Sequence, residues 1–279
     1  MISWGKALAL GVGLGWAVTI LIFYTRTKGL PVDAWCYYGM DPARPYDPDK
    51  CFLYSPPIAQ FMSVVQGTVP FDWFYTTIRV LEMVALALLA GPAIGAAVFI
   101  PAVAIEINAA NINILLVGAV VLGFRYPWTW AFVILTKVTP GVGLLWFAVR
   151  REWRNLAMAL GVTVAIAGIS LVVAPWMWGE YLAGLGSAPD TSPFQIWWRL
   201  PIAAAVVIWG ARSDRRWTLV LAVFLAMPRW YYLSPVILVG LFPLVRLPRP
   251  LTWRARLGWR DRQTAAATSD GRTARAPSS

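Results

Sequence analysis

The amino-acid sequence predicts an all-α polytopic membrane protein with about eight to ten transmembrane or re-entrant helices. Of its 279 residues, 59% are hydrophobic and only 13% are charged, whereas soluble domains carry about 25% charged residues. The mean hydropathy is +0.61. Apolar runs recur along most of the chain, and a soluble protein of this size has no core large enough to bury them all.

Residues 1–24 form the first apolar run, with Lys6 near its start. We interpret this run as a retained first span, because it is long and no clear small-residue cleavage site follows; a cleaved signal peptide is the alternative. A polar loop follows at residues 25–52. Several later runs are shorter than the roughly 20 residues of a full crossing, so we expect re-entrant or broken helices among them. The later runs cover residues 53–69, 73–91, 93–107, 111–124, 128–149, 155–176, 200–211, 217–228 and 233–246.

Basic residues cluster beside the apolar runs, at 150–154, at 212–216 and from residue 246 onward. The positive-inside rule places such clusters in the cytoplasm, and they also favour anionic lipid head groups. Counting crossings back from them puts both termini in the cytoplasm and places the 25–52 and 177–199 loops outside. The net charge of +11 therefore reports membrane topology, and we expect no nucleic-acid partner.

We predict two domains. Residues 1–247 form the membrane domain, which includes the outer loop 25–52. Residues 248–279 form a basic cytoplasmic tail, and the tail from 263 onward, rich in Ala, Ser, Thr, Arg and Pro, is typical of disorder.

The residue inventory limits the chemistry. The chain contains no histidine, which excludes His-based metal sites and every Ser-His or Cys-His mechanism. Its two cysteines, Cys36 and Cys51, are too few for a thiolate zinc site and lie in the outer loop, where a disulfide is permitted. Two unpaired thiols are the alternative. We expect neither a metal nor a cofactor.

Charged side chains inside or between apolar runs are costly and need a partner or a function. Glu106 is either part of a polar cavity or a loop acid. Lys137 either serves the site or forms a structural ion pair. Arg229 lies in a late loop, and Arg79 and Glu82, three residues apart on one helix, are expected to pair with each other.

Asp33 directly follows the first span and is framed by Trp35, Tyr37 and Tyr38. A carboxyl at a membrane face in such an aromatic setting can act as a general base. A solvated loop acid among interfacial aromatic residues is the alternative.

Four segments of the chain resemble glycosyltransferase family 87, polytopic enzymes of the C-type superfamily that use polyprenyl-phosphate sugars. The resemblance reaches from Asp33 to about Pro235, and each motif by itself is weak. The chain is shorter than typical members, lacks the histidine often found in the late loop, and has Ala and Asn where the family has Gly and Gln. The four segments are Asp33…Tyr37-Tyr38…Arg44-Pro45-Tyr46-Asp47…Tyr54-Ser55-Pro56-Pro57, Ala110-Asn111-Ile112-Asn113-Ile114-Leu115-Leu116, Lys137-Val138-Thr139-Pro140 and Pro228-Arg229-Trp230-Tyr231-Tyr232.

The resemblance implies a C-type glycosyltransferase-like bundle in the cell membrane. It implies transfer of a sugar, expected to be mannose, from a polyprenyl-phosphate donor to a lipid-linked or glycan acceptor on the extracytoplasmic face. The transfer would be inverting and metal-independent. It would need a base, a cation for the leaving phosphate and a groove open to membrane lipids.

The same resemblance suggests roles for individual residues. Asp33 is the expected catalytic base. The residues expected to bind substrate are Tyr37, Tyr38, Arg44, Tyr54, Asn111, Asn113, Lys137, Arg229 and Trp230.

Two other functions fit the same composition. A membrane transporter or lipid-sugar flippase would share the broken helices and buried charges, although no convincing internal repeat supports it. A shortened, inactive relative is the second. An enzyme should gather its polar residues under the outer loop, whereas a transporter should spread them near the midplane between two halves.

Overall fold

The fold is known from a computed structural model that describes residues 7–8, 10–15, 32–47, 51–97, 100–187, 195–230 and 234–246. These residues form an all-α structure with no β-strand, as predicted, apart from an isolated bridge between Asp41 and Arg44. Most of the predicted first span and the whole predicted tail lie outside the described residues.

Every apolar run from residue 53 onward contains at least one helix, and several runs contain two or more. The helices, in which η denotes the 3-10 type, are α2 (Val32–Tyr38), α3 (Pro56–Thr68), α4 (Phe71–Ala90), η1 (Gly91–Ala93), α5 (Ile94–Ala97), α6 (Pro101–Ala109), α7 (Asn113–Leu122), η2 (Pro127–Thr129), α8 (Trp130–Thr136), η3 (Thr139–Leu144), α9 (Leu145–Val149), α10 (Trp153–Val173), α11 (Pro175–Ser187), α12 (Ile196–Arg212), α13 (Trp217–Leu225), η4 (Ser234–Gly240) and α14 (Leu241–Arg246).

Prolines fix several of the helix starts. Proline suits the first position of a helix, since its missing N–H would be unpaired there and its φ is already helical. The residue before a proline prefers an extended backbone, and Ser55 before α3 and Ile100 before α6 both adopt it. The helices that begin with a proline are α3, α6, η2 and α11.

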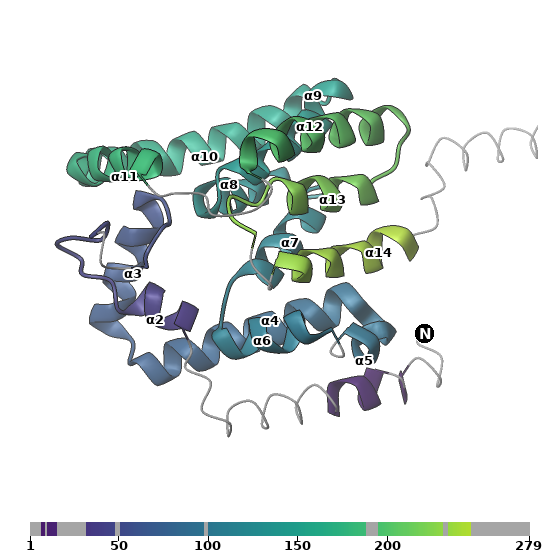
Figure 1. The fold of residues 1–279 in the computed structure, drawn as a ribbon, viewed down its shortest axis with the longest axis horizontal. Helices are drawn as coiled ribbons and strands as arrows, with labels where there is room; N and C mark the ends of the chain where they lie inside the picture. Colours follow the sequence, from purple (N-terminus) through teal and green to yellow (C-terminus); the bar gives the residue numbers. More distant parts are fainter. Residues whose placement is uncertain are drawn as a thin grey trace, which may run out of the picture. The chain divides into compact units, whose positions relative to one another are not determined.

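Long and short helices occupy different places. Figure 1 shows α10 and α12 along one side of the molecule and α4 along the other, with α7, α8, α13 and α14 between them. The inner helices supply much of the apolar core, for example Leu116, Trp130 and Val220, which are all fully buried. The long α10 instead exposes Val164, Ile169 and Val172, as expected of a helix that faces lipid.

Among the described residues, two helical segments are long and apolar enough to cross a membrane, Phe71–Ala93 and Trp153–Val173. The pair α6 and α7 would be a third if it forms one span, but it is bent by 104°. Together with the all-helical structure these segments define an all-α membrane protein. The broken helices expected from the short runs are therefore present, while the total of eight to ten crossing or re-entrant helices stays a prediction.

One predicted loop is wrong in detail. The segment 177–199 is largely helical, because α11 continues to Ser187 and α12 begins at Ile196. Helix α11 packs against the outer loop through Tyr181, whose ring centre lies 5.5 Å from that of Tyr46. The two segments that the charge pattern assigned to the same side of the membrane are thus in contact.

A disulfide joins Cys36 of α2 to Cys51, which decides the alternative that the sequence left open. The bridge closes a separation of 15 residues, a loop for which the chain-entropy model gives a stabilisation of about 3 kcal/mol. It ties α2 to the chain that leads into α3. The helix that carries Asp33 is therefore held covalently.

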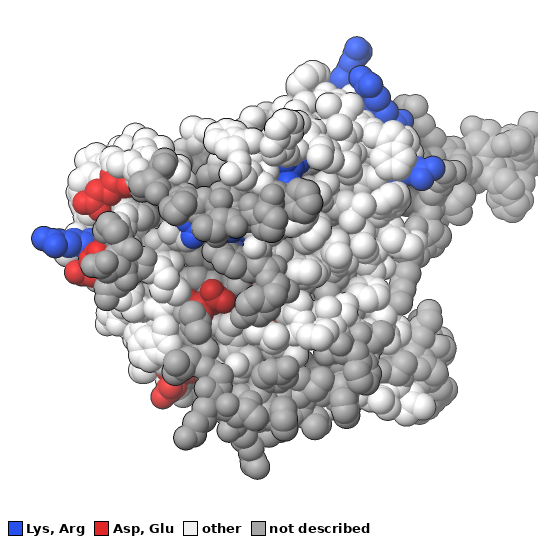
Figure 2. All heavy atoms as spheres, viewed as in Figure 1, with Lys and Arg blue, Asp and Glu red and all other residues white. Residues whose placement is uncertain are grey.

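The two basic segments, 150–154 and 212–216, meet at the start of α10, which is the end far from α11. Arg150 donates to Asp214 at 2.8 Å and to the Ala211 carbonyl at 3.3 Å, so the segments 150–154 and 212–216 lie side by side. Figure 2 shows basic side chains gathered at the upper right, where α9 and α12 end, and acidic side chains mainly on the left.

Candidate active site

Helix α2 places Asp33 in its first turn, where the side chain is half-buried. Burial raises the pKa of the Asp33 carboxyl above its ordinary value, and the charge of Lys137 counteracts part of this rise. Asp33 and Lys137 are 104 residues apart in the sequence and still interact electrostatically. The structure therefore places the predicted base within electrostatic range of one of the predicted phosphate ligands.

Lys137 lies where helix α8 ends. Its backbone is extended, with φ −143° and ψ 108°, and the next helical segment begins only at Thr139. The Lys137 ammonium donates a hydrogen bond to the side-chain oxygen of Asn113. Within the described residues Lys137 forms no direct ion pair, so the alternative of a structural ion pair is wrong.

Asn113 connects Lys137 to Glu106. The backbone N–H of Asn113 donates to Oε1 of Glu106 at 2.8 Å, and its side-chain amide donates to Oε2 at 3.3 Å. Glu106 is fully buried, so the loop-acid interpretation is wrong. Because Asn113 is the first residue of α7, the Glu106 carboxylate caps that helix and stabilises its positive end.

A sharp break between α6 and α7 makes this arrangement possible. Ala110 adopts the left-handed conformation with φ 50° and ψ 46°, which costs about 1–2 kcal/mol for a residue other than glycine. The break turns α7 through 104° relative to α6. As a result Glu106, near the end of one helix, faces the start of the next.

Three other predicted residues form a second hydrogen-bonded group. The Tyr37 hydroxyl donates to Oδ1 of Asn111 at 2.8 Å and lies 2.9 Å from the Tyr54 hydroxyl. Since Tyr37 has one proton to donate, Tyr54 is the donor in the second bond. Burial raises the pKa of the Tyr37 phenol well above its ordinary value, so the phenol stays neutral. The three hydrogen-bonded residues link the outer loop to the broken helix pair.

Four predicted residues lie elsewhere or have other contacts. The Tyr38 hydroxyl donates to the Val69 carbonyl at 2.7 Å. Arg44 is exposed in a turn of the outer loop. Arg229 is half-buried in the loop after α13. The Trp230 ring is stacked on Phe224 at 4.9 Å and donates its N–H to the Phe224 carbonyl. The substrate contacts proposed for these four residues stay predictions.

Sequence reasoning missed Arg199. Its side chain is 3% exposed and donates to the carbonyls of Leu225, Met227 and Pro228, at 3.1, 2.7 and 3.2 Å. Its guanidinium also lies 4.8 Å from the centre of the Trp230 ring. Arg199 thus satisfies the free carbonyls at the end of α13 and fixes the late loop. The only hint in the sequence is a charge just before the run 200–211.

Glu82 is the second residue whose importance the sequence hid. The expected ion pair with Arg79 does not form, because the Arg79 guanidinium lies over the Tyr75 ring at 4.8 Å. Glu82 is fully buried, and neither carboxylate oxygen has a hydrogen-bond partner within the described residues. It interacts electrostatically with Glu106 and Asp33. Three carboxyl groups therefore interact electrostatically with one another, and Asp33 and Glu106 also interact with Lys137.

The fold and these residues define a membrane protein with a polar, charged centre enclosed among broken helices. Comparison with known families identifies it further: the sequence model of glycosyltransferase family 87 matches residues 52–268. The match covers more than half of the chain, so the protein belongs to this family and is a membrane glycosyltransferase. Asp33, Tyr37, Tyr38 and Arg44 precede the matched segment. No curated protein and no solved structure matches the chain.

Proposed function

We propose that the protein transfers a hexose, expected to be mannose, from a polyprenyl-phosphate donor to a hydroxyl of a lipid-linked or glycan acceptor, with inversion at the anomeric carbon. The acceptor oxygen forms a bond to that carbon as the bond to the phosphate oxygen breaks. The hydroxyl proton passes to Asp33, and polyprenyl monophosphate leaves. The observation that carries the proposal is the electrostatic interaction of Asp33 with Lys137 in a member of this family.

Lys137 supplies the positive charge for the leaving phosphate. Its ammonium has three donors and gives one to Asn113, so donors remain for phosphate oxygens. Glu106, which accepts two hydrogen bonds from the same Asn113, balances the Lys137 charge when no sugar donor is bound. The cation can therefore stay charged in an apolar surrounding without being neutralised by a direct ion pair.

Access for a lipid-linked donor is supported by the residue next to Lys137. Val138 is 51% exposed although it lies between two buried helical segments. Lys137 itself is half-buried. An exposed valine beside a lysine, within an apolar run, is what a side opening toward lipid requires. The polyprenyl chain would lie against Val138 while the phosphate reaches Lys137.

The lengths of the helices support a site on the extracytoplasmic side. Helix α10 has 21 residues, a length of about 31 Å, and it runs from the basic segments to the end that contacts the outer loop. Helix α7 has only 10 residues, about 15 Å, and leads from Asn113 to Phe124, over whose ring Arg216 lies. The site then lies about 15 Å from the basic end, and it would be approached from the opposite side, where the outer loop lies.

The first experiment measures sugar transfer in membranes that contain the protein, using radiolabelled polyprenyl-phosphate mannose and a lipid extract. Asp33→Asn is the test variant. Asp72→Asn is the matched control, because Asp72 is an exposed acid at the start of α4. We expect transfer by the wild type and the control, and a loss of 100-fold or more in Asp33→Asn, as is typical when a general base is removed.

The outcomes separate the remaining functions. Full transfer by Asp33→Asn would support the glycosyltransferase class but show that Asp33 is not the catalytic base. Absence of transfer from this and other polyprenyl sugars, with the protein shown to be folded, would favour the flippase or the inactive relative. The polar residues form one group, which Tyr37 links to the outer loop through its bonds to Tyr54 and Asn111, and this favours the enzyme over a transporter with polar residues spread between two halves.

A further inference from the structure

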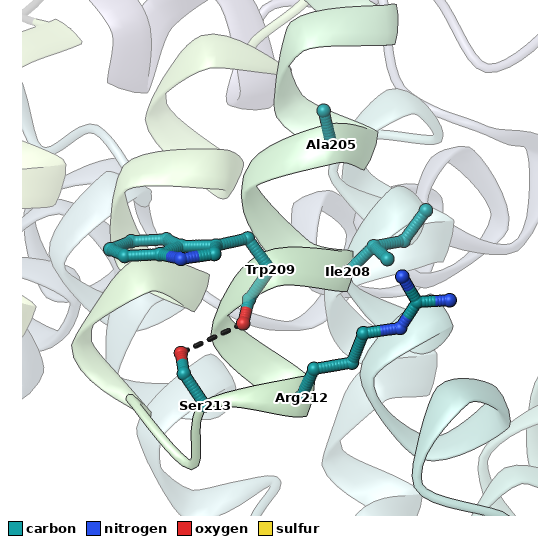
Figure 3. A pocket seen from close by; sticks show the side chains of 5 residues that line it. All are labelled: Ala205, Ile208, Trp209, Arg212 and Ser213. Atoms are coloured by element: carbon teal, nitrogen blue, oxygen red, sulfur yellow. Dashed lines mark hydrogen bonds between the residues drawn. The ribbon is translucent and has the colours of Figure 1, made fainter.

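A shallow groove lies at the basic end of helix α12, away from the candidate active site. It has a volume of about 460 Å³ and is lined by Ala205, Ile208, Trp209, Arg212 and Ser213. Four of these residues follow the spacing i, i+3, i+4, i+7, so they share one face of the helix. Figure 3 shows the Arg212 side chain folded back along the helix toward Ile208, with Ala205 one turn further on.

The groove changes from apolar to charged along its length. Ala205 and Arg212 are seven residues apart, a rise of about 10 Å on a helix. This rise is similar to the depth of about 5–10 Å over which an interfacial helix is immersed at the boundary between head groups and acyl chains. The Trp209 indole is 49% exposed and lies 6.0 Å from the Trp217 ring. Tryptophans of this kind mark the head-group level of a membrane.

Arg212 is available to bind an anion. The two acids of the neighbouring basic segments, Glu152 and Asp214, are both bound by Arg150. The Arg215 guanidinium lies over the Trp209 ring at 5.2 Å. Arg212 is exposed and forms no ion pair within the described residues. The Ser213 hydroxyl donates to the Trp209 carbonyl at 2.8 Å, and Arg212 is the charged side chain among the residues that line the groove.

We propose that this groove binds one anionic phospholipid. The lipid phosphate pairs with Arg212, and an acyl chain follows the face formed by Ala205, Ile208 and Trp209. A soluble anion would use only the charged end of the groove, and a zwitterionic lipid would bring a cationic amine beside its phosphate and so complement the basic end less well. A phospholipid with net negative charge matches both ends. The site is independent of the proposed transfer reaction, because it requires no sugar donor.

The test measures lipid binding to the purified full chain by native mass spectrometry, comparing dioleoylphosphatidylglycerol with dioleoylphosphatidylcholine. The test variant is Arg212→Gln, and the matched control is Arg154→Gln, which removes another exposed charge from the same end of the molecule. We expect the wild type and the control to retain a tightly bound phosphatidylglycerol. Arg212→Gln should weaken its binding tenfold or more.

Equal weakening in both variants would show that the basic end attracts lipid only through its overall charge, and would overturn the proposal. Equal binding of phosphatidylcholine would do the same. Ala205→Trp tests the apolar part separately, because it fills the groove and keeps every charge. We expect it to weaken phosphatidylglycerol binding severalfold; unchanged binding would contradict the placement of the acyl chain. Glycerol 3-phosphate, the soluble counterpart of the head group, should not displace the lipid.

Discussion

Helix α10 and the broken pair α6–α7 meet the demands of a membrane in opposite ways. Helix α10 runs unbroken for 21 residues, and most of its surface is apolar and exposed. The pair α6–α7 is interrupted at Ala110 and surrounds its break with Glu106, Asn111 and Asn113, all buried. A continuous helix satisfies its own backbone, whereas a broken helix must find partners for the freed groups. The candidate active site lies where those partners gather.

The largest effect should come from removing Glu106. Glu106→Ala takes away the cap of α7 and leaves the Lys137 charge without its balancing carboxylate, and the combined cost should be about 3 kcal/mol of unfolding free energy. Ser170→Ala, which removes from α10 a hydroxyl that accepts the Trp178 N–H, should cost about 1 kcal/mol. Unfolding in detergent measures both. Similar losses would show that the broken pair does not depend on its polar partners.

Arg199 plays a similar part at the end of α13, where it binds backbone carbonyls that the helix leaves free. Arg199→Lys keeps the charge but cannot reach three carbonyls at once, so the variant should lose about 1–2 kcal/mol of unfolding free energy. Transfer activity per folded molecule should also fall, since the loop with Arg229 is no longer fixed. Arg216→Lys at the basic end is the control. An Arg199→Lys protein with wild-type activity and stability would contradict the role of Arg199.

The pH dependence of transfer tests whether Lys137 acts on Asp33. Burial raises the pKa of Asp33, and Lys137 lowers it by favouring the charged carboxylate. A general base must be deprotonated to act, so activity falls as pH drops through the pKa of Asp33. Removing the Lys137 charge should raise this pKa and move the acid limb to higher pH.

We expect the acid limb of Lys137→Gln to shift upward by about one pH unit, a size typical for loss of a neighbouring charge. The residual activity of the variant is measured as a function of pH. Arg44→Gln, which removes an exposed charge from the same loop, should leave the limb where it is. An acid limb that stays in place would show that Lys137 and Asp33 do not interact.

The smallest effects are expected from two substitutions, one from alanine to glycine and one from glycine to alanine. Ala110→Gly should stabilise the protein by about 1 kcal/mol, because glycine adopts the left-handed conformation without strain. Gly168→Ala in α10 should also stabilise it, by about 0.5–1 kcal/mol, since an added Cβ meets no atom within 4 Å and alanine favours the helix. Thermal unfolding of both variants checks the pair. Destabilisation by Ala110→Gly would show that the break is not strained.

Several features of this protein followed from the sequence alone. Hydropathy depends on the residues of one segment, so the all-α membrane class, the runs from 53 onward and the expectation of broken helices could be predicted. The basic segments 150–154 and 212–216 were visible as local clusters. Motif resemblance gave the family and pointed to Asp33, Asn113 and Lys137.

The tertiary structure decided which of these residues meet. Lys137 bonds to Asn113, 24 residues away, and Arg199 bonds to carbonyls 26 to 29 residues away. The pairing of Cys36 with Cys51 and the burial of Glu82 were likewise left open by the sequence. The reason is physical: a hydrogen bond or an ion pair depends on the distance between two side chains, and only the packing of the helices sets that distance.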